Sequence, residues 1–140
     1  MSKEFVYEIY IQASRAAVWR GITDGEFTSR YFYATRVESD WQPGSVVCYL
    51  YDDGRLAVDG EVVSCEPERE LVITWLPHYD EASRAEGHTR VQYVLDDHEG
   101  QTRLRVVHSG FAEDSVLYEG IREGWPWILS GLKTVLEQAA

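Results

Sequence analysis

Basic residues are scarce in this sequence: 13 Lys and Arg stand against 24 Asp and Glu, which gives a net charge of −11. A nucleic-acid-binding surface needs clustered cations that displace counterions from phosphates, so we expect no nucleic-acid partner. The same balance argues against an anionic membrane surface. No stretch approaches the roughly 18 consecutive apolar residues of a membrane span, and residues 1–14 lack the features of a signal peptide. A cytoplasmic location without a membrane partner is the resulting expectation.

Cysteine is equally scarce, and Cys48 and Cys65 show neither a CxxC spacing nor a histidine at ligand spacing. We expect two buried, reduced thiols, with a disulfide or a reactive thiol as the alternatives. The GxSxG motif of serine nucleophiles, the HExxH motif of zinc proteases and a glycine-rich phosphate loop are also missing. The sequence therefore predicts no cofactor.

Four histidines recur every ten residues, at positions 78, 88, 98 and 108, and this regularity raises the question of a metal site. The strands expected below place His88 on the outer face of a sheet, His98 in a turn and His108 on the inner face. Side chains placed in this way cannot converge on one ion. We expect no metal.

Aromatic residues, by contrast, are plentiful: the sequence has five Trp, nine Tyr and four Phe. That number exceeds what a minimal core needs and favours either large-volume packing or an aromatic-lined cavity. The 140 residues can bury a proper core, and the length predicts a single domain over residues 1–140.

Hydrophobic periodicity divides the chain into three parts. Residues 4–11 alternate between apolar and polar and predict a half-buried strand, after which "ASRAAVWRGIT", with Ser14 as N-cap, and "DGEFTSRYF" predict two short helices. A period of two then predicts six strands with short, turn-rich connections, so sequential strands should pair antiparallel. The polar segment 77–87 is expected to be a flexible rim loop. The six strands are expected at 34–40, 46–51, 56–65, 70–76, 88–96 and 102–109.

The last part of the chain returns to a helical period and carries the stretch "GWPWILSGLKTVLEQ". One apolar stripe runs through Pro126, so we expect a single long helix that bends there rather than two helices. Gly124 and Gly131 flank the stripe, where missing side chains permit close backbone approach. Trp127 falls opposite the stripe and lies either under a loop or exposed. The stripe consists of Leu117, Tyr118, Ile121, Trp125, Ile128, Leu129, Leu132, Val135 and Leu136.

The order of these elements predicts an α+β fold: a curved antiparallel sheet of about seven strands wrapped around the long C-terminal helix. The only surface large enough to bury the apolar stripe is the concave face of that sheet. A four-residue turn at 97–100 ("DHEG") is expected to pair residue 96 with 101, 93 with 104 and 91 with 106. This pairing points His108 inward.

Four stretches carry a resemblance to a known family: "IQASRAAVW", "GEVVSCEPERELVITW", "TRLRVVHSGF" and "EGWPWILSGLKTVLEQ". They resemble the START-like (SRPBCC) superfamily and, within it, the homologues of the heat-shock-protein-90 ATPase activator. Together they span nearly the whole chain. The resemblance implies the helix-grip fold, with a deep cavity between sheet and helix that often holds a hydrophobic small molecule.

That superfamily has no single activity: it includes lipid carriers, hormone receptors, polyketide cyclases and aromatases, antibiotic-resistance binders and co-chaperones. The eukaryotic activator has a separate N-terminal chaperone-binding domain, for which these 140 residues offer no counterpart. We therefore place chaperone activation behind small-molecule binding.

Strand parity and the helix stripe name the residues expected to line the cavity. His108 and Tyr93 are also the candidates for an acid–base role, His108 because its ordinary pKa lies near neutrality and Tyr93 because a buried hydroxyl needs a partner. Plain core packing is the alternative for every one of these residues. The expected ligand-binding residues are Trp75, Tyr93, Val106, His108, Trp125 and Leu129.

Three functions follow from the sequence. The first is binding or sequestration of a hydrophobic small molecule. The second is an interaction module, such as a chaperone partner or a dimeric stress-response protein, which would show an exposed apolar patch around Trp127 and a space between sheet and helix already filled by side chains. The third is an enzyme of the polyketide cyclase or dehydratase kind, and on balance we expect no catalysis.

Overall fold

The computed structural model describes residues 3–138, which form one seven-stranded sheet and four helices. Along the chain the elements are β1 (Glu4–Ile11), α1 (Arg15–Thr23), α2 (Gly25–Tyr31), β2 (Arg36–Glu38), β3 (Val46–Leu50), β4 (Leu56–Glu66), β5 (Glu70–Pro77), α3 (Glu81–Ala85), β6 (Thr89–His98), β7 (Gln101–Ser109) and α4 (Val116–Gln138).

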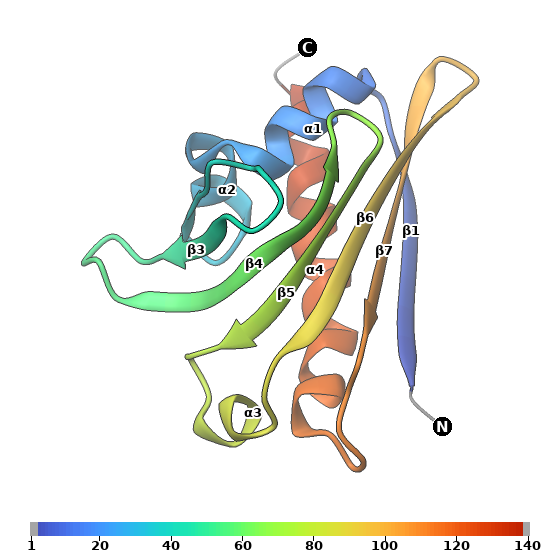
Figure 1. The fold of residues 1–140 in the computed structure, drawn as a ribbon. Coiled ribbons are helices and arrows are strands. Elements are labelled where there is room, and N and C mark those ends of the chain that lie inside the picture. The colour runs from blue at the N-terminus through green and yellow to red at the C-terminus, as the bar shows by residue number, and fades with distance from the viewer. Residues whose placement is uncertain (1–2, 139–140) are drawn as a thin grey trace.

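The strands lie in the order β1-β7-β6-β5-β4-β3-β2, and every neighbouring pair is antiparallel. The chain meanders from β2 to β7 through consecutive neighbours, and β1 then pairs with β7. Figure 1 shows this sheet with α4 running behind it. The edge strands are therefore β1, from the start of the chain, and the short β2.

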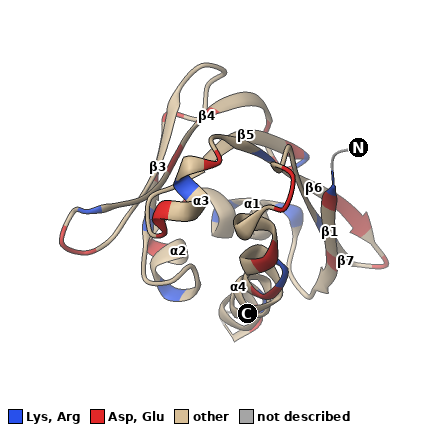
Figure 2. Cartoon of the chain, turned by 90° about the horizontal axis from the view of Figure 1, so that it is seen from below, with Lys and Arg blue, Asp and Glu red and all other residues tan. Residues whose placement is uncertain are grey.

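The sheet curves, and the helices lie inside its hollow. In Figure 2 the strands form an arc from β3 round to β1, with α1, α2, α3 and α4 within the arc. The apolar stripe of α4 is buried against the sheet, except that Tyr118 and Val135 are half-buried. The expected α+β helix-grip architecture is confirmed, and Pro126 lies within one continuous helix.

Local side-chain contacts explain how the short helices begin and how they dock. Ser14 caps α1, since its Oγ accepts a hydrogen bond from Ala17 N over 3.1 Å. α2 packs on α4 at Gly131, where an added Cβ would lie 2.9 Å from the Tyr31 Cβ. The close approach expected at Gly131 is therefore present, and it sets the position of the segment that follows α2.

The register of the β6–β7 hairpin differs from the expected one by two residues. His98 pairs with Gln101, and Tyr93 pairs with Val106. The turn has only two central residues, Glu99 (φ 48°) and Gly100 (φ 83°), and positive φ at both positions is the tight hairpin geometry. A shift of two leaves each side chain on its expected face, so His108 still points inward and is fully buried.

Two further expectations need correction. Segment 77–87 is not a loop throughout, because it contains α3, whose N-cap Asp80 accepts hydrogen bonds from the Ser83 backbone N and Oγ. Cys48 and Cys65 are unpaired, as expected, but half-buried rather than buried. Among the described residues, no helix combines the length and apolar character needed to cross a membrane.

Candidate ligand pocket

A cavity of about 320 Å³ opens between the middle of α4, strands β3 to β5 and the segment after α2. Its lining holds no charged side chain. The aliphatic part comes from Ala57, Val58, Ile121 and Ile128, and Gly120 and Gly124 contribute backbone of α4. The aromatic part consists of Phe32, Tyr33, Tyr49, Tyr51, Trp75, Tyr79 and Trp125.

The inner wall of the pocket is a packed group of aromatic rings. Phe32 stacks on Tyr49 with ring centroids 4.7 Å apart and meets Trp125 edge-on at 6.0 Å. The rings of Trp75 and Trp125 lie 5.6 Å apart. All four residues are buried, so this wall exists before any ligand enters.

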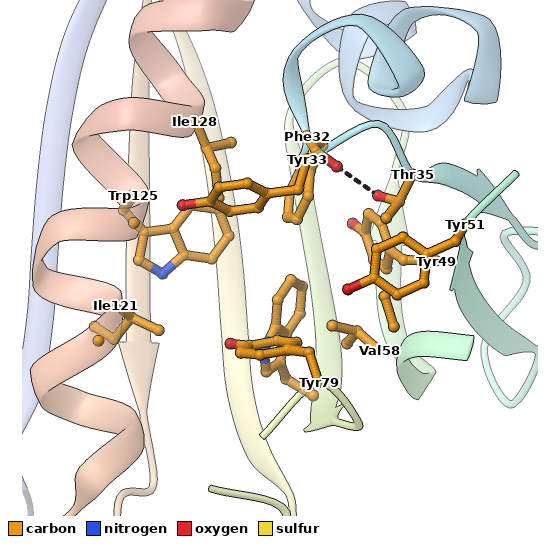
Figure 3. Close-up of a pocket in the computed structure, with 14 residues that line it drawn as sticks. Phe32, Tyr33, Thr35, Tyr49, Tyr51, Val58, Tyr79, Ile121, Trp125 and Ile128 are labelled. Atoms are coloured by element: carbon orange, nitrogen blue, oxygen red, sulfur yellow. Dashed lines mark hydrogen bonds between the residues drawn. The ribbon is translucent and has the colours of Figure 1, made fainter. Parts of the chain in front are cut away.

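Three tyrosines stand at the mouth. Tyr33 and Tyr79 are each 54% exposed, and Tyr51 is half-buried. In Figure 3, Tyr33 and Tyr79 lie on opposite sides of an open space, with both hydroxyls directed toward α4. Partial burial of the Tyr79 side chain, followed by the effects of Tyr33, Asp80 and Tyr51, raises the pKa of Tyr79 to about 12. The Tyr79 hydroxyl therefore stays protonated and uncharged near neutral pH.

A chain of hydrogen bonds holds in place the indole of Trp125, which is part of the inner wall. Trp125 Nε1 donates to His108 Nδ1 over 3.1 Å, and His108 Nε2 lies 2.7 Å from Thr89 Oγ1. An indole N–H can only donate, so Nδ1 must be the unprotonated nitrogen and Nε2 carries the proton toward Thr89. Thr89 Oγ1 in turn donates to the Trp75 carbonyl over 3.3 Å.

The same network defines the chemical state of His108. Both ring nitrogens are engaged, and burial lowers the pKa of the imidazole to about 3. The ring is therefore neutral throughout the physiological range. In this state His108 orients Trp125 and has no free nitrogen for a substrate.

The expected site residues fall into two groups. Trp75 and Trp125 line the cavity. The other four, Tyr93, Val106, His108 and Leu129, are buried in the core beside it, where Tyr93 meets the Trp125 ring edge-on at 6.0 Å. A direct role of these four in ligand contact or catalysis stays a prediction.

Sequence reasoning missed the three tyrosines at the mouth. Tyr33 lies in the turn after α2 and Tyr79 just before α3, so the period of a strand or helix gives no information about these two. Tyr51 is the last residue of the strand expected at 46–51 and lies just after the observed β3. For Tyr33 the available signal was local, namely the aromatic run "YFY" at 31–33. Burial raises the pKa of Tyr31, and partial burial raises the pKa of the more exposed Tyr33.

One polar group of the lining is unsatisfied. Within residues 3–138, Trp75 Nε1 is buried and has no hydrogen-bond partner. A buried donor without a partner costs about 1–3 kcal/mol. The same part of the chain contains no group of three His, Cys, Asp or Glu side chains arranged to hold a metal ion.

The curved sheet gripping a long helix, with an apolar pocket between them, defines a helix-grip protein. A family model described as "Activator of Hsp90 ATPase homolog 1-like protein" matches residues 12–137. The chain belongs to this family. No curated protein matches the sequence.

The fold is also similar to that of several solved structures. The protein MLL2253 from Mesorhizobium loti is 26% identical, with a TM-score of 0.84 and 99% of each chain covered. The Aha1 dimer from Colwellia psychrerythraea is 20% identical, with a TM-score of 0.77 and 96% of each chain covered. DynU16, a protein of the dynemicin biosynthetic locus, is 19% identical, with a TM-score of 0.78 over 97% of this chain and 48% of its own. The last two likenesses show the fold alone.

Proposed function

We propose that this protein binds a hydrophobic small molecule in the cavity between the curved sheet and α4. The observation that carries the proposal is the cavity itself: about 320 Å³, without a charged lining residue and with seven aromatic side chains in its wall. Small-molecule sites in proteins have volumes of roughly 300–1,000 Å³ and are mostly apolar. The cavity therefore fits a compact ligand of the size of two or three fused rings.

Pre-organisation supports the same proposal. The His108 hydrogen bond holds the Trp125 ring in place, and the Phe32–Tyr49 stack forms the neighbouring part of the same inner wall. A ligand that enters such a site loses little free energy in ordering the protein.

The enzyme alternative has less support. Its two candidate residues are absent from the cavity lining, and His108 uses both of its nitrogens within the core. Burial raises the pKa of Tyr93 well above its ordinary value, with a further contribution from Tyr49, which makes Tyr93 a poor proton donor. Binding without chemistry is the simpler function for this arrangement.

Native mass spectrometry of protein purified without denaturation tests the proposal, because a molecule that co-purifies reveals its own mass. The matched variant is Gly124→Leu, which brings a side chain into the lining at a helical position where leucine is a better helix former than glycine. Ser130→Leu, at an exposed position of α4, is the control. We expect a bound mass in the wild type and in Ser130→Leu, and its loss in Gly124→Leu.

The converse result would contradict the proposal. If the wild type carries no adduct, and a thermal-shift screen of hydrophobic compounds gives no stabilisation, the cavity is not a binding site. A ligand at 100 times its dissociation constant should add about 2.7 kcal/mol to the free energy of unfolding, which such a screen detects easily.

A protein-contact function is the second candidate, and Trp127 is the observation that favours it. This side chain is 67% exposed on α4, opposite the buried stripe. The Colwellia relative was solved as a dimer, so a homodimer is the first assembly to test. If Trp127 lies in a dimer interface, Trp127→Ser will convert a dimer to a monomer in sedimentation velocity. A wild-type monomer would contradict this idea.

A further inference from the structure

We infer that the pocket selects a flat, uncharged aromatic molecule that enters between the rings of Tyr33 and Tyr79 and leaves its polar end at the Tyr33 hydroxyl. Tyr33 is then the residue that determines specificity at the mouth. This inference rests on the proposed function and narrows it to one chemical class of ligand.

Charge is the first argument. A buried ion needs an opposite charge or several hydrogen bonds to replace its water, and no charged side chain lines this cavity. The Arg55 guanidinium lies 4.9 Å from the centre of the Tyr51 ring, but its Nε is paired with Asp53 at 2.7 Å. Asp80, the residue after Tyr79, raises the pKa of Tyr79 through its negative charge and would repel an anion. A carboxylate ligand would therefore be disfavoured both inside the cavity and at its mouth.

The shape of the opening also favours a flat ligand. Tyr33 and Tyr79 stand on the two sides of the opening in Figure 3, and the inner wall is built from stacked and edge-on aromatic rings. Planar rings meet aromatic side chains favourably in both arrangements. A flat aromatic molecule would use the sides of the opening and the inner wall at once, whereas a flexible alkyl chain would lose conformational freedom without matching either surface.

Backbone strain at Tyr33 is the third argument. Tyr33 (φ 50°) and Ala34 (φ 59°) are consecutive residues in the left-handed region, which ordinary side chains rarely adopt. They form the centre of a tight turn closed by Thr35 N donating to the Phe32 carbonyl over 3.0 Å. Asn and Gly are the residues that favour such a turn. Strained backbone of this kind gathers at ligand clamps, where the surrounding structure holds it in place.

The turn is held firmly. The Thr35 side chain donates to the Phe32 carbonyl over 2.6 Å, and Thr28 Oγ1 donates to the Thr35 carbonyl over 2.9 Å. Both threonines are buried. These contacts hold the backbone of the turn that carries Tyr33.

The α4 side of the mouth leaves room for a polar substituent. Gly120 and Gly124 line the cavity there without side chains. A Cβ added at Gly124 would lie 3.6 Å from the Tyr33 hydroxyl oxygen, so this hydroxyl faces the gap along the helix. A hydroxyl or carbonyl on the outer end of the ligand would lie within reach of Tyr33 and of water.

Four probes that share one ring system test the inference: naphthalene, β-naphthol, β-naphthoate and the β-naphthyl trimethylammonium ion. Their dissociation constants would be measured by ligand-observed NMR at about pH 7, where the naphthol is neutral and the naphthoate is ionised. We expect β-naphthol to bind at least tenfold more tightly than either ion. Tyr33→Phe should weaken β-naphthol binding about threefold to tenfold, and naphthalene binding should not change.

Tyr10→Phe is the matched control, because Tyr10 is an exposed tyrosine on β1, at the other edge of the sheet. Equal or tighter binding of the naphthoate would overturn the inference and leave the proposed function intact. Tighter binding of the ammonium ion would replace it with an aromatic cage for cations. If Tyr33→Phe and Tyr10→Phe change β-naphthol binding equally, Tyr33 is not part of the binding site. Absence of binding by all four probes would count against the proposed function itself.

Discussion

The indole Nε1 of Trp125 donates a hydrogen bond to Nδ1 of His108 over 3.1 Å, in the interior of the protein. This contact joins the central turn of α4 to β7 and holds a wall of the pocket. It also defines which nitrogen of the histidine is protonated, because the indole cannot accept. A residue whose ordinary pKa suits acid–base chemistry is thereby used to orient an aromatic ring.

The buried state of His108 predicts how stability depends on pH. The native pKa is about 3, and the unfolded imidazole titrates near 6.5, so between these values only the unfolded state binds the proton. The free energy of unfolding should therefore fall as the pH is lowered through this window, by up to about 1.4 kcal/mol per pH unit from this group. Above the unfolded pKa, His108 adds no pH dependence. Urea denaturation at a series of pH values measures the slope.

His108→Gln isolates this contribution, since it removes the titrating group and retains a polar side chain. We expect a lower stability than wild type near neutral pH and a shallower decline toward acid. His88→Gln is the control, because His88 is exposed at the start of β6. If wild type and His108→Gln decline with the same slope, the histidine is not held neutral by its burial.

Much of the architecture could be predicted from the sequence, because hydrophobic periodicity reports directly on which face of an element is buried. The alternation in β1 and the stripe of α4 gave the sheet and the helix in its hollow. The β6–β7 register could not be derived in the same way. Pairing Tyr93 with Leu104 or with Val106 buries the same faces, and only the conformations of Glu99 and Gly100 decide between them.

The pocket was harder to predict than the fold. Trp75 could be predicted from the alternation along its strand, and Trp125 from the apolar stripe of its helix, because both lie on regular elements. Tyr33 and Tyr79 lie in connecting segments, where the direction of a side chain depends on turn geometry and not on hydrophobic periodicity. The sequence also does not show whether a buried histidine faces a cavity or, as His108 does, uses both ring nitrogens in hydrogen bonds to neighbouring side chains.

Two glycines of α4 should respond oppositely to alanine. At Gly131 an added Cβ would lie 2.9 Å from the Tyr31 Cβ, so α2 must shift, and we expect a net loss of about 1 kcal/mol or more. At Gly120 an added Cβ meets nothing within 4 Å, and the better helix propensity of alanine should add about 0.5–1 kcal/mol. Chemical denaturation of Gly131→Ala and Gly120→Ala gives both values. Equal stabilisation by the two changes would mean that α2 does not pack closely on α4.

The strained turn predicts a stabilising substitution at Ala34. Glycine adopts φ near 59° without steric cost, so Ala34→Gly should raise the free energy of unfolding by a few tenths to about 1 kcal/mol despite the greater freedom of the unfolded chain. Ala16→Gly in helix α1 is the control, and there the same change should cost about 1 kcal/mol. A loss of stability in Ala34→Gly would show that the turn is not strained.

Glu86 connects the segment that carries Tyr79 to the start of α4. One carboxylate oxygen accepts from Ser115 Oγ over 2.5 Å, and the other accepts from the Val116 backbone N over 2.7 Å. This places a negative charge at the helix N-terminus, where the macrodipole favours it. Glu86→Ala should therefore cost about 1–2 kcal/mol and speed amide hydrogen exchange in the first turn of α4.

The control for this last change is Glu113→Ala, which removes an exposed carboxylate from the connection between β7 and α4 without a capping hydrogen bond to lose. We expect its stability and exchange rates to match wild type. Because Glu86 also anchors α3, its loss should increase exchange from Glu81 to Ala85 as well. Faster exchange confined to α4 would mean that α3 is held by its own cap at Asp80, and that the position of Tyr79 does not depend on the start of α4.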